Sequence, residues 1–103
     1  MRGDVFALKA PRDAVGREQQ YERFAVVVQS DDLPLSTWLV APTSTSARPA
    51  TFRPEVEVNG EATLVLAEQT AAIDPQRLGT HVGRLTLGEI QHVDAALRLV
   101  LGI

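Results

Sequence analysis

The chain has 103 residues, of which 45% are hydrophobic and 22% are charged, as is usual for a globular protein. It contains no cysteine, which excludes disulfides, cysteine-ligated metal centres and thiol nucleophiles. Thirteen acidic residues against ten basic ones give a formal net charge of −3 at pH 7, so binding to RNA or DNA would require local basic clusters.

Nine of the ten basic residues are arginine, and two groups of them are candidates for such clusters. One group comprises Arg12, Arg17 and Arg23, and the other comprises Arg48 and Arg53. A chain of this length can bury one core, so we expect a single domain over residues 1–103. The N-terminal sequence MRGDVFALKAPRD lacks an apolar stretch long enough for a signal peptide or a membrane span. We therefore expect a cytoplasmic protein with no membrane partner.

The first elements in chain order are two strands separated by a long polar segment. Residues 4–10 alternate in polarity and predict a strand that stops at Pro11. Residues 12–22 predict a surface loop, and loops of this length are often functional. Residues 24–29 are apolar on both sides, which predicts a central strand.

The middle of the chain predicts a third strand and then a hairpin. Residues 37–41 predict a strand ended by Pro42, followed by the hydroxyl-rich run TSTS over residues 43–46. Residues 55–58 alternate, and Asn59-Gly60 favours a type I′ turn leading into a strand over residues 62–67. Residues 69–73 predict a short strand or bend, and Asp74-Pro75 a turn.

The end of the chain predicts a helix. Thr86 and Glu89 have the spacing of a capping box, and Gly102 stands where a helix would stop. Between them, apolar residues recur at helical spacing on one face: Ile90, Val93, Ala96, Leu97, Val100 and Leu101. The expected fold is therefore mainly β plus α, a small SH3-like antiparallel β-barrel of five to seven strands with a packed C-terminal helix.

Several segments in this order resemble the MazF/PemK family of toxin endoribonucleases over nearly the whole chain. They are RGDVFAL, GREQQ, RFAVVVQSD, VAPTSTS, AEQTAAID, RLGTHVGRLT and VDAALRLVLGI. The resemblance implies a homodimer that cleaves single-stranded RNA without a metal or other cofactor and is held inactive by a cognate antitoxin. Cleavage would use the substrate's 2′-hydroxyl as the nucleophile and leave 2′,3′-cyclic phosphate and 5′-hydroxyl ends.

The resemblance also assigns catalytic roles to four residues. Arg23 matches the family's arginine at the start of a strand, and its fixed positive charge suits stabilisation of the phosphorane. Ser44 matches a catalytic threonine with Thr45 beside it, so either hydroxyl could act; hydroxyls in such loops more often serve as turn residues. Glu68 matches an acidic position that some branches use as a general base, although the arginine those branches carry two residues earlier is Leu66 here.

Four further residues are candidate RNA contacts. Gln69 matches a residue that reads a base edge, and Arg17 and Gln19 lie in the first loop, in GREQQ. Arg48 is a further RNA-binding candidate, from the second basic cluster. No group of residues has metal-ligand spacing, and the two histidines, His81 and His92, are expected to lie away from the groove.

Two other functions remain as alternatives. Gyrase-directed toxins of similar fold end in Trp-Gly-Ile, whereas this chain ends in Leu101-Gly102-Ile103 and lacks the aromatic residue. A non-enzymatic peptide-binding barrel would need an exposed aromatic groove, which an aromatic content of 5% supports poorly. Trp38 lies in a core-like strand and is expected to pack or to contact a dimer partner.

Overall fold

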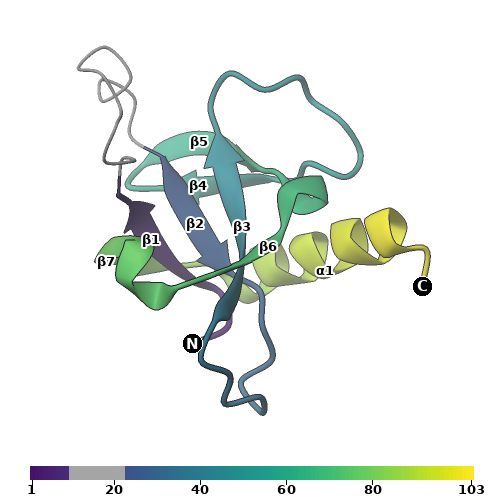
Figure 1. Cartoon of the computed structure of the whole chain (residues 1–103). Coiled ribbons are helices and arrows are strands. Elements are labelled where there is room, and N and C mark those ends of the chain that lie inside the picture. The colour runs from purple at the N-terminus through teal and green to yellow at the C-terminus, as the bar shows by residue number, and fades with distance from the viewer. Residues whose placement is uncertain (10–22) are drawn as a thin grey trace.

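The computed structural model describes residues 1–9 and 23–103, and shows a curved sheet with one long helix (Figure 1). Seven strands form the sheet: β1 (Asp4–Leu8), β2 (Phe24–Val27), β3 (Trp38–Ser44), β4 (Glu55–Val58), β5 (Glu61–Val65), β6 (Ala71–Ile73) and β7 (Leu78–Arg84). Two short 3-10 turns, η2 (Ala67–Gln69) and η3 (Pro75–Arg77), precede β6 and β7, and the helix α1 (Leu87–Leu101) ends the chain.

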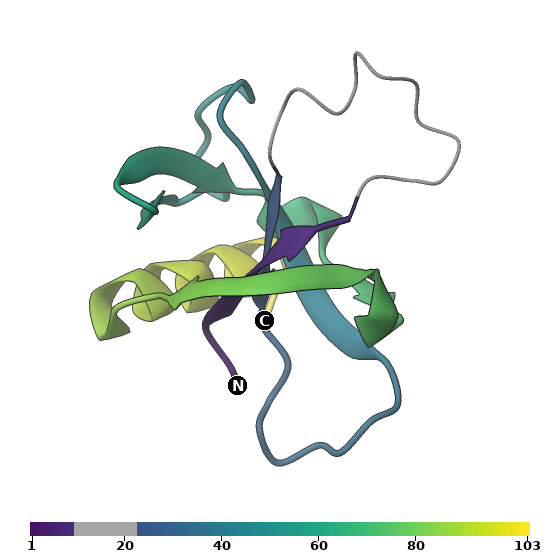
Figure 2. The ribbon, with the colours of Figure 1, turned by 90° about the vertical axis from the view of Figure 1, so that its left-hand side faces the viewer.

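The strands are antiparallel and follow the order β4-β5-β3-β2-β1-β7, with β6 paired to the first part of β3. The sheet curls into a half-barrel, as the side view makes clear (Figure 2). The expected mainly β fold with a C-terminal helix is confirmed. Within the described residues, no helix is long and apolar enough to cross a membrane.

The strand boundaries differ from the sequence-based prediction in three places. β1 ends at Leu8 and β2 at Val27, each earlier than predicted. β3 runs through Pro42 to Ser44, so the prediction that Pro42 ends it was wrong. Pro42 is tolerated because it pairs with Ala25 across the sheet and contributes its carbonyl, which accepts a 2.8 Å hydrogen bond from the N–H of Leu66.

The second half of the sheet also departs from the prediction. β5 ends at Val65, and the residues after it turn into η2 because the N–H of Gln69 bonds to the carbonyl of Leu66. β6 confirms the short strand expected before Asp74. β7 was not predicted, because its sequence LGTHVGR contains two glycines and lacks clear alternation; it pairs with β1 in a register that shifts twice.

Both turn and cap signals are confirmed. Asn59 and Gly60 have φ values of 54° and 78°, the positive values that a type I′ turn needs at both positions. Thr86 and Glu89 form a complete capping box, and Gly102 closes α1 in the left-handed conformation with φ 72°.

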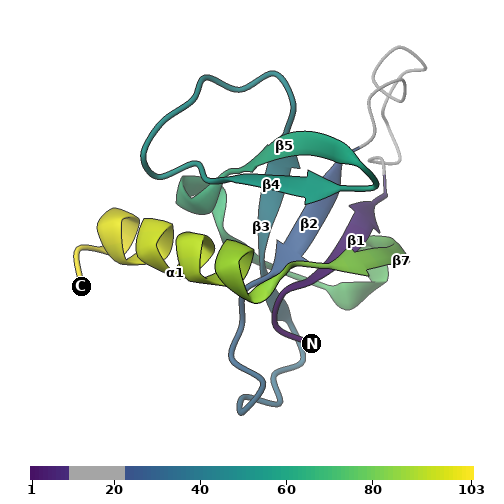
Figure 3. The same ribbon diagram turned by 180° about the vertical axis from the view of Figure 1, so that it is seen from behind.

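Successive residues of β2 point to opposite faces of the sheet, and each face has its own core. Val26 and Val28 belong to the larger core, with Val56, Val65 and Val93, which α1 and the β4–β5 hairpin cover (Figure 3). The smaller core lies on the other face and consists of Ala25, Val27, Val40 and Leu78, with Phe6, Leu8, Trp38 and Ile73 packed against it.

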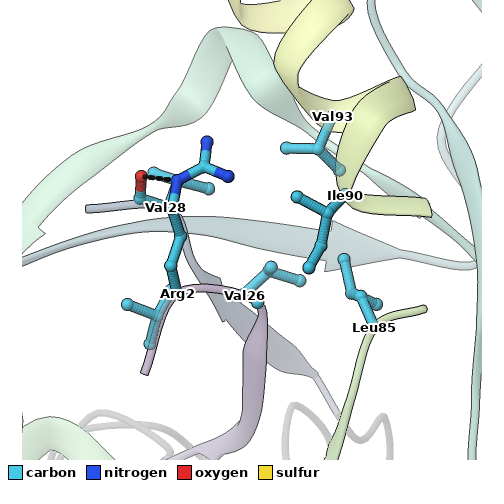
Figure 4. A pocket seen from close by; sticks show the side chains of 8 residues that line it. Arg2, Val26, Val28, Leu85, Ile90 and Val93 are labelled. Carbon is cyan, nitrogen blue, oxygen red and sulfur yellow. Dashed lines mark hydrogen bonds between the residues drawn. The ribbon is translucent and has the colours of Figure 1, made fainter. Parts of the chain in front are cut away.

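Arg2 fastens the chain start to α1. Its Nε–H donates to the carbonyl of Val28 at 3.1 Å (Figure 4). Its Nη2 pairs with Asp94 on the helix. The crevice beside it, between Val26 and Ile90, holds no space large enough for a water molecule. The helix therefore lies closely against this face, and the candidate site must be sought elsewhere.

Candidate active site

The pairing of β2 with β3 brings Arg23 and Ser44 to the same end of the sheet. The register pairs Ala25 with Pro42; Arg23 lies two residues before Ala25, and Ser44 lies two residues after Pro42. The start of β2 and the end of β3 lie at the same end of the sheet (Figure 1). Arg23, just before β2, is exposed.

Two hydrogen bonds fix the backbone around Arg23. The carbonyl of Arg23 accepts a 2.9 Å bond from the N–H of Leu8 on β1, and the N–H of Phe24 donates to Oγ1 of Thr43 at 3.3 Å. Thr43 is 2% exposed, so this hydroxyl lies inside the sheet. The peptide group that joins Arg23 to Phe24 is therefore bonded to β1 on one side and to β3 on the other, and Arg23 itself is exposed.

Ser44 organises the turn that follows β3. Its Oγ accepts hydrogen bonds from the N–H groups of Ser46, at 3.2 Å, and Ala47, at 3.0 Å, and lies 3.4 Å from Oγ of Ser46. This is the turn role that serine often has beside a loop. Its hydroxyl proton can still be donated, and the neighbouring Thr45 is exposed.

Glu68 does not stand alone, as the sequence suggested, but pairs with Arg53. Nε and Nη2 of Arg53 both donate to Oε2 of Glu68, at 3.0 and 2.6 Å. Arg53 lies in the segment between β3 and β4. Some branches of the family carry an arginine at the position of Leu66, and here Arg53 is the positively charged partner of Glu68 instead. Nothing in the sequence joins these residues, because they are 15 positions apart on different elements.

The ion pair changes the chemistry of Glu68. The hydrogen bonds from Arg53 lower the pKa of Glu68 below its ordinary value of 4.5, against the opposing effect of burial. The same bonds raise the pKa of Arg53. Oε1 of Glu68 is buried and has no hydrogen-bond partner among the described residues. A carboxylate that holds its charge this firmly is a weak proton acceptor.

The remaining candidates are placed as follows. Gln69, at the end of η2, and Arg48, between β3 and β4, are both exposed. Arg17 and Gln19 lie outside the described residues. Glu68 and Gln69 are separated from Arg23 by β3. Arg23 lies next to β2, which pairs with one side of β3, whereas the N–H of Leu66 bonds to the carbonyl of Pro42 on the other side of β3.

The histidines and Trp38 lie away from this edge. His81 Nε2 is 3.2 Å from Oδ1 of Asp4, His92 is exposed on α1, and Trp38 packs against Phe6 with ring centroids 5.9 Å apart. Within residues 1–9 and 23–103, no three His, Cys, Asp or Glu side chains are grouped so that they could hold a metal ion.

Residues 1–101 match the family described as PemK-like, MazF-like toxin of type II toxin–antitoxin system. The chain belongs to this toxin family. A protein of Mycobacterium tuberculosis (strain H37Rv) named as a candidate toxin, Rv3098A, is 38% identical over 104 residues, which is 100% of this chain and 98% of that protein.

Solved structures with the same fold include several toxins. An endoribonuclease from a mycobacterial species, in complex with its cognate antitoxin, has a TM-score of 0.78 at 16% identity, with 100% of this chain and 95% of that one covered. M. tuberculosis toxin MazF-mt6 has a TM-score of 0.76 at 15% identity, covering 97% of each chain. MazF from Deinococcus radiodurans has a TM-score of 0.76 at 20% identity, covering 98% of this chain and 94% of that one.

Proposed function

We propose that this toxin is an endoribonuclease that cuts single-stranded RNA at specific sequences, with Arg23 and a hydroxyl of Ser44 or Thr45 at the reacting phosphate. The proposal rests on the β2–β3 register, in which Ala25 pairs with Pro42, so that Arg23 and Ser44, each two residues beyond this pair, come to the same end of the sheet. Family membership and the endoribonucleases among proteins of the same fold support it.

The reaction proposed needs no metal. The 2′-hydroxyl of the RNA gives its proton to water while its oxygen attacks the adjacent phosphorus and forms a new P–O bond. The bond to the 5′-oxygen breaks and that oxygen takes up a proton from water, leaving a 2′,3′-cyclic phosphate and a 5′-hydroxyl. Negative charge grows on the non-bridging oxygens as this happens. The guanidinium of Arg23 and the hydroxyl of Ser44 or Thr45 would donate hydrogen bonds to these oxygens, and would bind their charge more tightly in the transition state than in the substrate.

An RNA cleavage assay in excess EDTA tests this proposal. Wild-type protein is expected to cut a long single-stranded RNA, and sequencing of the released 5′ ends would give the preferred site. Arg23→Ala should lower kcat by roughly 100-fold or more, the effect of removing a donor to a developing charge. Arg98→Ala removes an exposed positive charge on α1 and serves as the matched control.

Two results would contradict the proposal. An Arg23→Ala protein that folds normally and cuts at the wild-type rate removes Arg23 from the mechanism. If the wild-type protein leaves all single-stranded RNA intact, the proposed endoribonuclease activity is wrong.

We further propose that the toxin acts in the cytoplasm as one domain over residues 1–103, forms a homodimer, and is neutralised by a cognate antitoxin. Support comes from the family, whose members are toxins of type II toxin–antitoxin systems, and from proteins of the same fold solved with antitoxins, including a MazE–MazF complex from D. radiodurans. Sedimentation equilibrium of the purified toxin tests the dimer, and a mass of one chain at micromolar concentration would contradict it.

A further inference from the structure

We propose that Arg53 and Glu68 are positioning residues, which hold the segment between β3 and β4 for RNA binding and thereby set which RNA sites are cut. The inference rests on the proposed function. It gives Glu68 a different role from the general base that the family resemblance suggested.

The first argument is that the segment 45–54 is held at both ends. At its start, Ser44 accepts hydrogen bonds from the N–H groups of Ser46 and Ala47. Near its end, Arg53 pairs with Glu68 and also donates from Nη1 to the carbonyl of Arg48 at 3.0 Å. One side chain therefore spans the segment and ties it to η2.

The second argument concerns how well Arg53 itself is fixed. Its guanidinium carbon lies 5.5 Å from the centre of the Phe52 ring, and the side chains of Arg53 and Glu68 are 22% and 25% exposed. A partly buried pair whose cation lies over an aromatic ring is screened less by salt than a fully exposed one. The pair can therefore hold one geometry in solution.

The third argument is that neither oxygen of Glu68 is offered to a substrate. Oε2 already accepts both hydrogen bonds from Arg53, and Oε1 is buried. A general base must come within hydrogen-bond reach of the proton that it removes. This carboxylate instead faces into the protein and towards its partner.

The fourth argument links the pair to RNA contacts. Gln69 follows Glu68 in a turn closed by the bond from Thr70 N–H to the carbonyl of Ala67, so the pair with Arg53 is made by the residue next to the exposed Gln69. On the other side, Arg53 holds the backbone of Arg48. The Arg53–Glu68 pair thus links the segment that carries Arg48 to the turn that carries Gln69. Both segments adjoin β3, the strand that ends at Ser44.

A double-mutant cycle on RNA cleavage tests the inference. Arg53→Gln, Glu68→Gln and the double variant are assayed for kcat and KM, and the 5′ ends that each releases from one long RNA are sequenced. Each single variant should raise KM by roughly tenfold and redistribute the cut positions, with kcat changed by less than about twofold. The double variant should be no worse than either single one, because both remove the same interaction.

Controls separate positioning from folding. The Arg2→Gln and Asp94→Asn variants break a similar half-exposed pair on the α1 side and should leave the cut positions unchanged. The charge exchange Arg53→Glu with Glu68→Arg should recover part of the wild-type site preference. If Arg53→Gln does not fold, Arg53→Lys replaces it as a milder variant that keeps the positive charge.

The outcomes distinguish the two proposals. Loss of kcat in Glu68→Gln, with Arg53→Gln behaving like wild type, would make Glu68 the general base and overturn the inference. Unchanged KM and cut positions in both variants would overturn it as well, while leaving the endoribonuclease activity standing. Absence of cleavage by the wild-type protein would overturn both.

Discussion

The N–H of Phe24, the first residue of β2, donates a hydrogen bond to the buried hydroxyl of Thr43 on β3, at 3.3 Å. At this point the two strands are joined through a side chain, and Phe24 and Thr43 are the chain neighbours of Arg23 and Ser44. The contact makes Thr43 a determinant of the site, although its hydroxyl lies inside the sheet and does not reach solvent.

We predict that Thr43→Val lowers both stability and activity, whereas Thr43→Ser largely preserves them. Valine fills the same volume but leaves the Phe24 N–H without its acceptor, at a cost of roughly 1–3 kcal/mol. Urea unfolding followed by circular dichroism measures the change in stability. The RNA cleavage rate, measured without urea so that every variant is folded, gives the change in activity. Equal stability of the Val and Ser variants would show that the hydroxyl contributes nothing.

The features predicted correctly from the sequence are those whose signals are local. Thr86 and Glu89 are three residues apart, and Asn59 and Gly60 are adjacent, so the cap and the turn are visible in the chain itself. β7 escaped prediction because Gly79 and Gly83 interrupt its pattern, and only pairing with β1 makes it a strand.

The candidate site was less accessible to such reasoning. The placement of Arg23 and Ser44 at one end of the sheet depends on the β2–β3 register, which no local pattern predicts. Family resemblance suggested the two residues, and their catalytic role stays a prediction. The pairing of Arg53 with Glu68 could not be foreseen, because a strand pair and a turn separate them along the chain and neither residue type specifies its partner.

A comparison of Ser44→Ala with Thr45→Val should separate the two hydroxyls. Ser44 already accepts two backbone N–H groups, so its removal should loosen the turn and raise KM for RNA. Thr45 is exposed and its side chain makes no such bonds to residues 1–9 or 23–103, so Thr45→Val, which keeps the volume, should lower kcat while leaving KM unchanged. Steady-state cleavage kinetics distinguish these effects, and a fall in kcat confined to Ser44→Ala would assign the chemistry to Ser44.

Acid should destabilise the protein through three carboxylates. For Asp4, burial acts to raise the pKa, but hydrogen bonds with His81 and the N-terminal amine lower it below the ordinary 3.8. The pKa values of Glu68 and Glu89 are lowered below 4.5. Because the unfolded chain binds these protons more tightly, the stability is fully present above about pH 5 and is lost as the pH falls through the folded-state values.

The measurement is the free energy of unfolding in urea between pH 7 and pH 3. Asp4→Asn should be less stable than wild type at pH 7 and should lose less stability on acidification, since one of the three groups no longer titrates. Asp32→Asn alters an exposed carboxylate and should follow the wild-type curve. An Asp4→Asn curve parallel to that of wild type would remove Asp4 from this effect.

Glu89 should matter more to stability than its capping partner Thr86. Thr86→Ala removes the side-chain acceptor for the N–H of Glu89, at a cost of about 1 kcal/mol, which Thr86→Ser should avoid. Glu89 accepts from the N–H of Thr86 at 2.9 Å and from the N–H of Glu57 on β4 at 2.8 Å, so it joins the start of α1 to an edge strand. Glu89→Ala should therefore cost about 1 kcal/mol more than Thr86→Ala in urea unfolding, because it frees two backbone donors on separate elements. Equal losses in the two variants would mean that the bond to β4 adds nothing to the cap.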